Sequence, residues 1–217
     1  MNILAIDTAC PILSAAVSCK EKLYYSELQA GVKQTELVMD CIDALIKKAD
    51  LKPCDLEGII CMGGPGSFTG LRIGFSVAKG LSLSLSIPFM PYPTLDCIAF
   101  PFHNSAMTLA VIESSKNAWF YAFYEGGKSV KTAAEAESAK IAEEIEKIEP
   151  KSIILTGSGA ESLYKTLPEK PKKGLSFVNE KRGYAKELIA IAKKEKLLDN
   201  YNAANIFSGP EYIKKAV

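Results

Sequence analysis

The chain has 217 residues, of which 48% are hydrophobic and 24% charged, with 26 Lys and Arg against 25 Asp and Glu. This composition excludes an intrinsically disordered protein, because so much apolar surface must be buried. The net charge of +1 also disfavours a protein that grips nucleic acid by itself, since phosphate contacts call for a basic excess. The length predicts one domain or two small lobes.

The apolar and cysteine patterns bear on location and on metal binding. Residues 80–91 form the longest apolar run, which serines and a proline interrupt well short of the roughly 18 residues that a membrane span needs. The first six residues lead straight into Asp7 without a basic stretch, which predicts no signal peptide and a cytoplasmic location. The cysteines include no C-x-x-C pair and His103 is the one histidine, so no metal site is expected.

The first half of the chain predicts an antiparallel meander followed by alternating helices and strands. Strand-like runs separated by polar turns are expected at residues 1–6, 14–19 and 23–28. Apolar residues three and four apart then predict a helix at 35–48, with Thr35 as its N-cap. The elements expected next are a buried strand at 59–62, a helix ending near 85, a strand at 89–91 and a helix at 94–99.

The second half repeats this order more loosely. It predicts paired strands at 107–112 and 119–124, an acidic amphipathic helix at 133–148, a buried strand at 152–156, a helix at 160–167, a strand at 175–178 and a helix at 184–194. The two halves therefore suggest a duplicated α/β unit. We expect an N-terminal lobe at 1–104 and a C-terminal lobe at 105–217, whose last segment can pack back on the first lobe.

A glycine-rich segment at 63–74 lies between the buried strand and the second helix. It lacks the Lys of a Walker phosphate loop, and Pro65 and Thr69 stand where a G-x-S-x-G nucleophile elbow needs glycine. A dinucleotide fingerprint is closer, but its glycines are spaced G-x-G-x-x-x-G, and the nearest acidic residue for a ribose is Asp96, in the first turn of a helix.

Small residues in this segment favour a structural interpretation. Gly70, Gly74 and Ala78 are four residues apart, so they form one stripe that lets another backbone approach the helix, inside the fold or in a partner. Arg72 would neutralise an anion near the loop or pair with a carboxylate of a neighbouring helix, and the ion pair is the favoured reading.

Four segments in order along the chain carry a resemblance to a known family. The segment at 64–74 (GPGSFTGLRIG), the opening MNILAIDTA, PTLDCIA at 93–99 and PEYIK at 210–214 resemble the bacterial TsaB (YeaZ) family. The resemblance implies an α/β, actin-like ATPase fold, as in sugar kinases, Hsp70 and actin, with two duplicated lobes. It also implies a non-catalytic subunit that helps to make N6-threonylcarbamoyladenosine in tRNA. Such a subunit binds its paralogue TsaD and the ATPase TsaE, and contacts tRNA only indirectly.

Three nucleotide-binding elements of that fold are weakened here. Asp7 and Thr8 stand at the first phosphate turn without the usual glycine, and Glu113 replaces the Asp of the second turn. Gly157 and Gly159 mark the adenosine turn, where Ser158 interrupts the paired glycines. We therefore expect no catalytic residue, no metal and no firm cofactor. The four weak candidates for nucleotide contact are Asp7, Thr8, Gly157 and Gly159, for ATP or ADP bound weakly or at an interface.

Two departures from the family pattern also concern functional segments. Gln34 lies in a segment where the family often has His-Ser-Glu, and Glu113 begins one where it often has Asp-Ala-Arg. The first and second helices are expected to pack against the equivalent pair of TsaD, or of a second copy in a homodimer. The predicted partner-binding residues are Leu37, Val38, Cys41, Leu45, Gly70, Arg72, Gly74 and Ala78. The alternative is a stand-alone ATPase or phosphotransferase in which Asp7 and Glu113 hold magnesium.

Overall fold

The computed structural model describes residues 1–105, 107–148, 152–178, 181–199 and 208–213. The chain forms two compact units. The first consists of Met1–Cys97 with Arg182–Glu211, and the second of Ile98–Lys181 with Tyr212–Val217. The predicted lobes were 1–104 and 105–217, with a last segment that can pack back on the first lobe; the last long helix packs on the sheet of the first unit.

The first unit is built on a five-stranded sheet with the order β3-β2-β1-β4-β5. Its strands are β1 (Ile3–Asp7), β2 (Leu13–Cys19), β3 (Lys22–Leu28), β4 (Gly58–Gly64) and β5 (Phe89–Pro93). The first three pair antiparallel, as the predicted meander requires, whereas β1, β4 and β5 run parallel. Every residue of β4 is buried, which agrees with its continuous apolar sequence.

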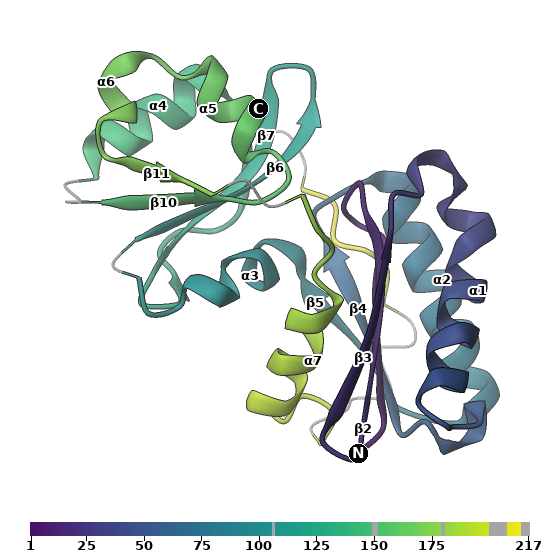
Figure 1. The fold of residues 1–217 in the computed structure, drawn as a ribbon. Helices are drawn as coiled ribbons and strands as arrows, with labels where there is room; N and C mark the ends of the chain where they lie inside the picture. The colour runs from purple at the N-terminus through teal and green to yellow at the C-terminus, as the bar shows by residue number, and fades with distance from the viewer. Residues whose placement is uncertain (106, 149–151, 179–180, 200–207, 214–217) are drawn as a thin grey trace. The chain divides into compact units, whose positions relative to one another are not determined.

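Helices cover both faces of this sheet. The helices α1 (Gln34–Lys48) and α2 (Phe68–Leu85) lie on one face, and α7 (Ala185–Lys194) lies on the other (Figure 1). A short helix, α3 (Thr94–Ala99), follows β5. The core on the α1 and α2 side joins strand residues such as Leu4 and Ile59 to helix residues such as Ile42 and Phe75. Apolar residues at helical spacing therefore cover the sheet, as the sequence predicts.

The start of α1 differs from the prediction by one residue. A 3₁₀ turn (Gly31–Lys33) leads into the helix, Lys33 holds the N-cap position and Thr35 lies exposed in the first turn. The physical reason is a buried contact of Gln34, whose Nε2 donates to the carbonyl oxygen of Cys10 at 3.1 Å. That hydrogen bond holds the Gln34 side chain against the turn after β1, and Gln34 is the first residue of the helix.

The second unit has a sheet with the order β11-β10-β6-β7-β8, and β9 also pairs with β7. The strands are β6 (Thr108–Ser115), β7 (Ala118–Glu125), β8 (Lys128–Ser129), β9 (Ala134–Glu137), β10 (Ile153–Thr156) and β11 (Leu175–Phe177). Read in the opposite direction, this order reproduces that of the first sheet, with the antiparallel pair β6–β7 matching β1–β2 and the parallel pair β10–β6 matching β4–β1. The two sheets thus confirm the predicted duplication.

The helices of the second unit are α4 (Ser138–Lys147), α5 (Ala160–Thr166) and α6 (Glu169–Lys172). The predicted helix at 133–148 is wrong over its first residues, because Ala134–Glu137 is strand β9, paired antiparallel with β7. Ala134 and Ala136 pack on the core of this unit, while Glu135 accepts a hydrogen bond from the Ser114 hydroxyl at 2.7 Å. Strand pairing and this alternation override the helical propensity of the segment.

Candidate functional site

The first weak nucleotide candidate, Asp7, ends β1 and is completely buried. Its Oδ1 accepts a hydrogen bond from the Ala9 backbone N–H at 3.1 Å, and its Oδ2 accepts one from the Tyr184 N–H at 2.9 Å. Burial raises the pKa of this carboxyl to about 6, although the backbone donors favour its charged form. Both oxygens of Asp7 are therefore engaged within the first unit.

Two further backbone N–H groups at the start of α7 donate hydrogen bonds to side chains of the sheet. The Ala185 N–H donates to Ser14 Oγ at 3.1 Å, and the Gly183 N–H donates to Glu27 Oε2 at 3.2 Å. These amides have no partner inside the helix, so the sheet supplies the acceptors that a helix N-terminus needs. In this structure Asp7 has the role of a capping residue that anchors α7.

The turn after β1 explains the stripe of small residues. Thr8 Oγ1 donates to the carbonyl oxygen of Gly70 at 2.7 Å. A Cβ on Gly70 would collide with the carbonyl oxygen of Thr8, and one on Gly74 would lie 2.6 Å from Thr8 Oγ1. Ala78, the third member, is fully buried. The stripe therefore permits the close approach of α2 to the β1 turn inside the fold.

At the start of the glycine-rich segment a second stretch of backbone, around Glu211, lies close to the chain. Gly64 has φ +115°, and a Cβ there would collide with the carbonyl oxygen of Glu211. The Glu211 N–H donates to the carbonyl oxygen of Gly63 at 2.7 Å, and the Lys79 ammonium donates to that of Ser208. Residues near the C-terminus thus cross the carboxyl end of β4, which requires glycine at this turn.

Ser67 ends the loop and caps α2, since its Oγ accepts a hydrogen bond from the Gly70 N–H at 3.1 Å. We expect Ser67→Ala to lower the free energy of unfolding by about 1 kcal/mol, because the first turn of α2 loses its side-chain acceptor. Urea denaturation followed by circular dichroism measures the change. The control is Ser84→Ala, an exposed site in the same helix, and an equal effect of both substitutions would contradict the capping role.

The candidates of the second unit are packed against β6. Gly157 has φ +107°, and a Cβ there would collide with the carbonyl oxygen of Val111. A Cβ on Gly159 would lie 2.6 Å from the backbone nitrogen of Glu113 and 2.8 Å from Cδ1 of Trp119. The Glu113 side chain is exposed. These glycines therefore have a packing role in their turn.

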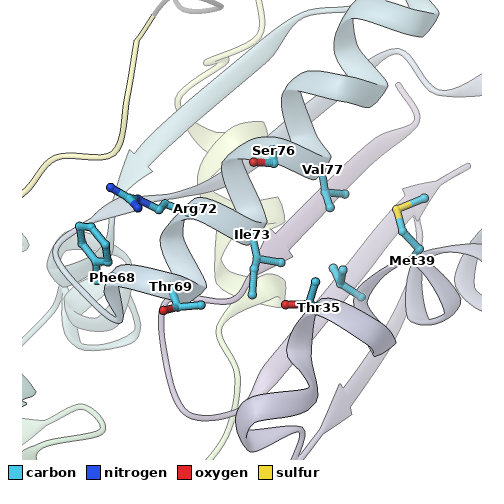
Figure 2. A pocket seen from close by; sticks show the side chains of 9 residues that line it. Thr35, Met39, Phe68, Thr69, Arg72, Ile73, Ser76 and Val77 are labelled. Carbon is cyan, nitrogen blue, oxygen red and sulfur yellow. The ribbon is translucent and has the colours of Figure 1, made fainter.

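A groove of about 370 Å³ lies between α1 and α2 (Figure 2). It is lined by Thr35, Val38, Met39, Phe68, Thr69, Arg72, Ile73, Ser76 and Val77. Met39 is 46% exposed and Phe68 53% exposed, which is unusual for side chains of this size. Apolar side chains thus form most of the groove, and Arg72 is the one charged residue among those that line it.

Arg72 stacks on an aromatic ring within this groove. Its guanidinium carbon lies 3.8 Å from the centroid of the Phe68 ring, one helical turn earlier in α2. This is a cation–π contact, and the ion pair that the sequence analysis favoured for Arg72 stays a prediction. Figure 2 shows the two side chains next to each other at the start of α2, with Ile73 directed toward α1.

The structure places the eight predicted partner-binding residues in different environments. Six of them are buried within the first unit, namely Val38, Cys41, Leu45, Gly70, Gly74 and Ala78. Leu37 is half-buried and packs on the core, and Arg72 is exposed. Partner binding itself stays a prediction, and the large apolar side chains exposed on this surface, Met39 and Phe68, are neighbours that the sequence analysis did not select. The sequence signal that could have identified these side chains is their position next to the core positions of α1 and α2.

Two features are absent from the residues that the structure describes. No group of three or more His, Cys, Asp or Glu side chains in that part of the chain is arranged to hold a metal ion. Among the same residues, no helix is both long enough and apolar enough to cross a membrane.

Comparison with solved structures defines the class of the protein. The structure titled YeaZ from Pseudomonas aeruginosa superposes with a TM-score of 0.81 at 18% identity, covering 98% of this chain and 99% of that chain. AlfA from a Bacillus subtilis plasmid superposes with a TM-score of 0.50 at 10% identity, covering 89% of this chain. At these identities the likeness concerns the fold. Together with the duplicated sheets, it defines a protein of the actin-like ATPase fold.

Sequence comparison then gives the family. The family model described as TsaD, tRNA N6-adenosine threonylcarbamoyltransferase, matches residues 29–209, so the chain belongs to this family. The TsaB protein of Bacillus subtilis is 38% identical over 101 residues, 46% of this chain and 44% of the relative. That of Haemophilus influenzae is 29% identical over 125 residues, 56% and 52% of the two chains. The matched segments span about half of these relatives' length.

Proposed function

We propose that this chain is a non-catalytic scaffold subunit for the synthesis of N6-threonylcarbamoyladenosine, at the adenosine next to the anticodon of tRNA. It binds the catalytic paralogue TsaD and the ATPase TsaE in the cytoplasm, and it reaches tRNA only through them. The observation that carries the proposal is family membership, since the curated relatives are threonylcarbamoyladenosine biosynthesis proteins.

The environment of Asp7 supports a non-catalytic role. A carboxylate that holds a nucleotide-bound cation needs at least one oxygen directed toward that cation. Here the carboxylate is fully buried and both of its oxygens accept backbone hydrogen bonds. If Oδ2 turned toward a cation, the Tyr184 N–H would lose its hydrogen bond and the start of α7 would be less stable. Asp7 thus binds the start of α7 at the position where an ATPase of this fold would use it for chemistry.

The groove between α1 and α2 supports partner binding. Exposed apolar side chains gathered in one depression are typical of a surface that another protein covers. Met39, Phe68 and Ile73 would supply the apolar contact, and the hydroxyl groups of Thr35 and Ser76 would supply hydrogen bonds. A partner of the same fold carries an equivalent helix pair, so the two pairs can pack as a bundle. A second copy of this chain could use the same surface when TsaD is absent.

The proposal is tested by co-purification of the chain with tagged TsaD and TsaE, followed by an assay for the modified nucleoside in tRNA. We expect a stable complex whose activity is lost when this chain is omitted. Calorimetry with Mg-ATP tests the alternative of a stand-alone ATPase. Micromolar binding together with turnover by the isolated chain would contradict the scaffold role.

A substitution in the groove tests which surface the partner covers. We expect Met39→Glu to weaken binding to TsaD at least about tenfold, because a carboxylate would have to be buried without a partner. The matched control is Ala44→Glu, which adds the same charge at an exposed position of α1 outside the groove. Biolayer interferometry gives both affinities, and circular dichroism verifies the fold. Equal affinities of the two variants would contradict this surface assignment.

A further inference from the structure

We infer that a hollow beside α4 in the second unit binds a segment of another protein in which apolar side chains stand between acidic ones. The hollow has a volume of about 450 Å³ and is lined by four apolar and four charged residues, three of which lie on α4. All of them belong to the second unit, so the site is separate from the α1–α2 groove of the first. The inference therefore goes beyond the proposed function and does not depend on it.

The apolar part of the lining belongs to the core of the second unit. Met107 and Phe123 are buried members of that core, and Ile148 packs against it. Val130 completes this part of the lining and is 54% exposed, while its backbone N–H donates to the carbonyl oxygen of Phe123 at 2.8 Å. A side chain that covered Val130 and its neighbours would remove apolar surface from water, so the hollow favours an apolar residue in the middle of the bound segment.

The charged part of the lining is positive. Three lysines against one glutamate give the lining a net charge of +2, whereas the whole chain has +1. The glutamate, Glu144, is 13% exposed and accepts an ion pair from the Lys131 ammonium at 2.6 Å. Burial raises the pKa of the neighbouring Tyr121, and the Glu144 carboxylate raises it further, so the Tyr121 hydroxyl stays protonated beside Glu144. The Glu144 charge is thus balanced within the unit, and Lys140 and Lys147 remain to attract an acidic partner.

These two lysines are poorly neutralised within the chain. Lys140 lies 3.5 Å from Glu143, but both side chains are more than half exposed, so this ion pair is weak. Among the residues that the structure describes, Lys147 has no hydrogen bond or ion pair. The helix dipole favours Lys147 in the last turn of α4, but it disfavours Lys140 in the first turn, which contains no acidic residue. Helix stability therefore gives no reason for a lysine at position 140.

The spacing of the lysines separates an acidic peptide from other anions. Lys140 and Lys147 lie two turns of α4 apart, which is about 10 Å along the helix axis. A single phosphate or carboxylate binds best where several donors converge, and a nucleic acid needs several basic groups along one surface and no apolar pocket. A peptide with acidic residues on both sides of an apolar one can fill the hollow and place a carboxylate near each ammonium group.

The test uses the full chain with carbon-13 in its methionine methyl groups, and a synthetic peptide in which Leu and Phe stand between pairs of Glu. Met107 lines the hollow and Met39 lines the α1–α2 groove, so their NMR signals report on the two surfaces separately. We expect the peptide to shift the Met107 signal in a saturable way and to leave that of Met39 unchanged. Peptides with Gln in place of Glu, or with Ser in place of Leu and Phe, should bind at least about tenfold more weakly.

Substitutions in the chain locate the contact. The double variant Lys140→Glu/Lys147→Glu should weaken peptide binding at least about tenfold through like-charge repulsion. The matched control Lys116→Glu/Lys173→Glu makes the same charge change at exposed positions of the second unit outside the hollow, and should leave the affinity unchanged. Circular dichroism verifies the fold of both variants.

Three results would overturn the inference. The first is a Met107 signal that the peptide does not shift, and the second is equal affinity of the two double variants for the peptide. The third is a single-stranded RNA oligonucleotide that shifts the Met107 signal at lower concentration than the peptide, which would indicate a phosphate contact instead. None of these measurements involves TsaD, so their failure would leave the proposed function untouched.

Discussion

Gly70→Val is expected to prevent stable folding of the first unit, with a loss of more than about 4 kcal/mol in the free energy of unfolding. The Cβ of any residue at this position would collide with the carbonyl oxygen of Thr8, and the same carbonyl belongs to the turn that follows β1. Backbone cannot move aside as a flexible side chain does, so α2 would have to leave the sheet. Urea denaturation, or the soluble yield where the variant does not fold, measures this effect.

The matched control lies in the same helix. Gly80 is exposed and has no atom within 4 Å of a built Cβ, so Gly80→Ala should raise the free energy of unfolding by about 0.5–1 kcal/mol through helix propensity. Opposite signs at two glycines of one helix would show that contact with the β1 turn decides the outcome. A Gly70→Val variant as stable as the wild type would contradict the close packing described here.

Asp7→Asn is expected to change how stability depends on pH. The folded-state pKa of Asp7 is about 6 against an ordinary value of 3.8, so the folded state favours the protonated form. Its stabilising contribution is complete below pH 3.8 and is lost as the pH rises through 6. Between pH 4.5 and 7.5 the wild type should therefore lose about 2 kcal/mol relative to Asp7→Asn, which carries no ionisable group there.

This comparison needs unfolding curves of both proteins at several pH values, since other groups titrate over the same range. The control is Asp40→Asn on the exposed side of α1, which should leave the pH dependence parallel to that of the wild type. Curves for Asp7→Asn that run parallel to the wild type over the whole range would show that the Asp7 carboxyl is not desolvated.

Much of the fold could be predicted from local patterns. The meander, the fully buried β4 and the helices α1 and α2 follow from short-range apolar spacing, which packing then preserves. One exception is β9, where four residues of alternating Ala and Glu precede a true helix with no break. A run of four residues is compatible with the period of a helix and with that of a strand. Its pairing with β7 is decided by residues that are distant in the sequence.

The site was harder to predict for the same reason. Spacing identified the stripe of Gly70, Gly74 and Ala78, but it could not tell whether the neighbouring backbone belonged to this chain or to a partner. Thr8 supplies that backbone, and it lies 62 residues before Gly70. The four-residue spacing places Phe68 beside Arg72 on α2, but whether the two side chains stack depends on which side of α2 stays exposed. Departures from a family pattern pointed to Asp7, but its acceptor role required the position of α7.

The anchor of α7 has a consequence for the order in which the protein is made. Asp7 leaves the ribosome before Tyr184, because the Tyr184 amide that binds it is synthesised 177 residues later. During translation the strands of the first sheet are therefore made before the Tyr184 amide that binds the Asp7 carboxylate. The second unit, which is largely contiguous in sequence, can already fold at that stage. A stalled nascent chain that ends before α7 should expose this carboxylate and the face of the sheet that α7 covers. Such a chain is the form of the protein that a chaperone would meet.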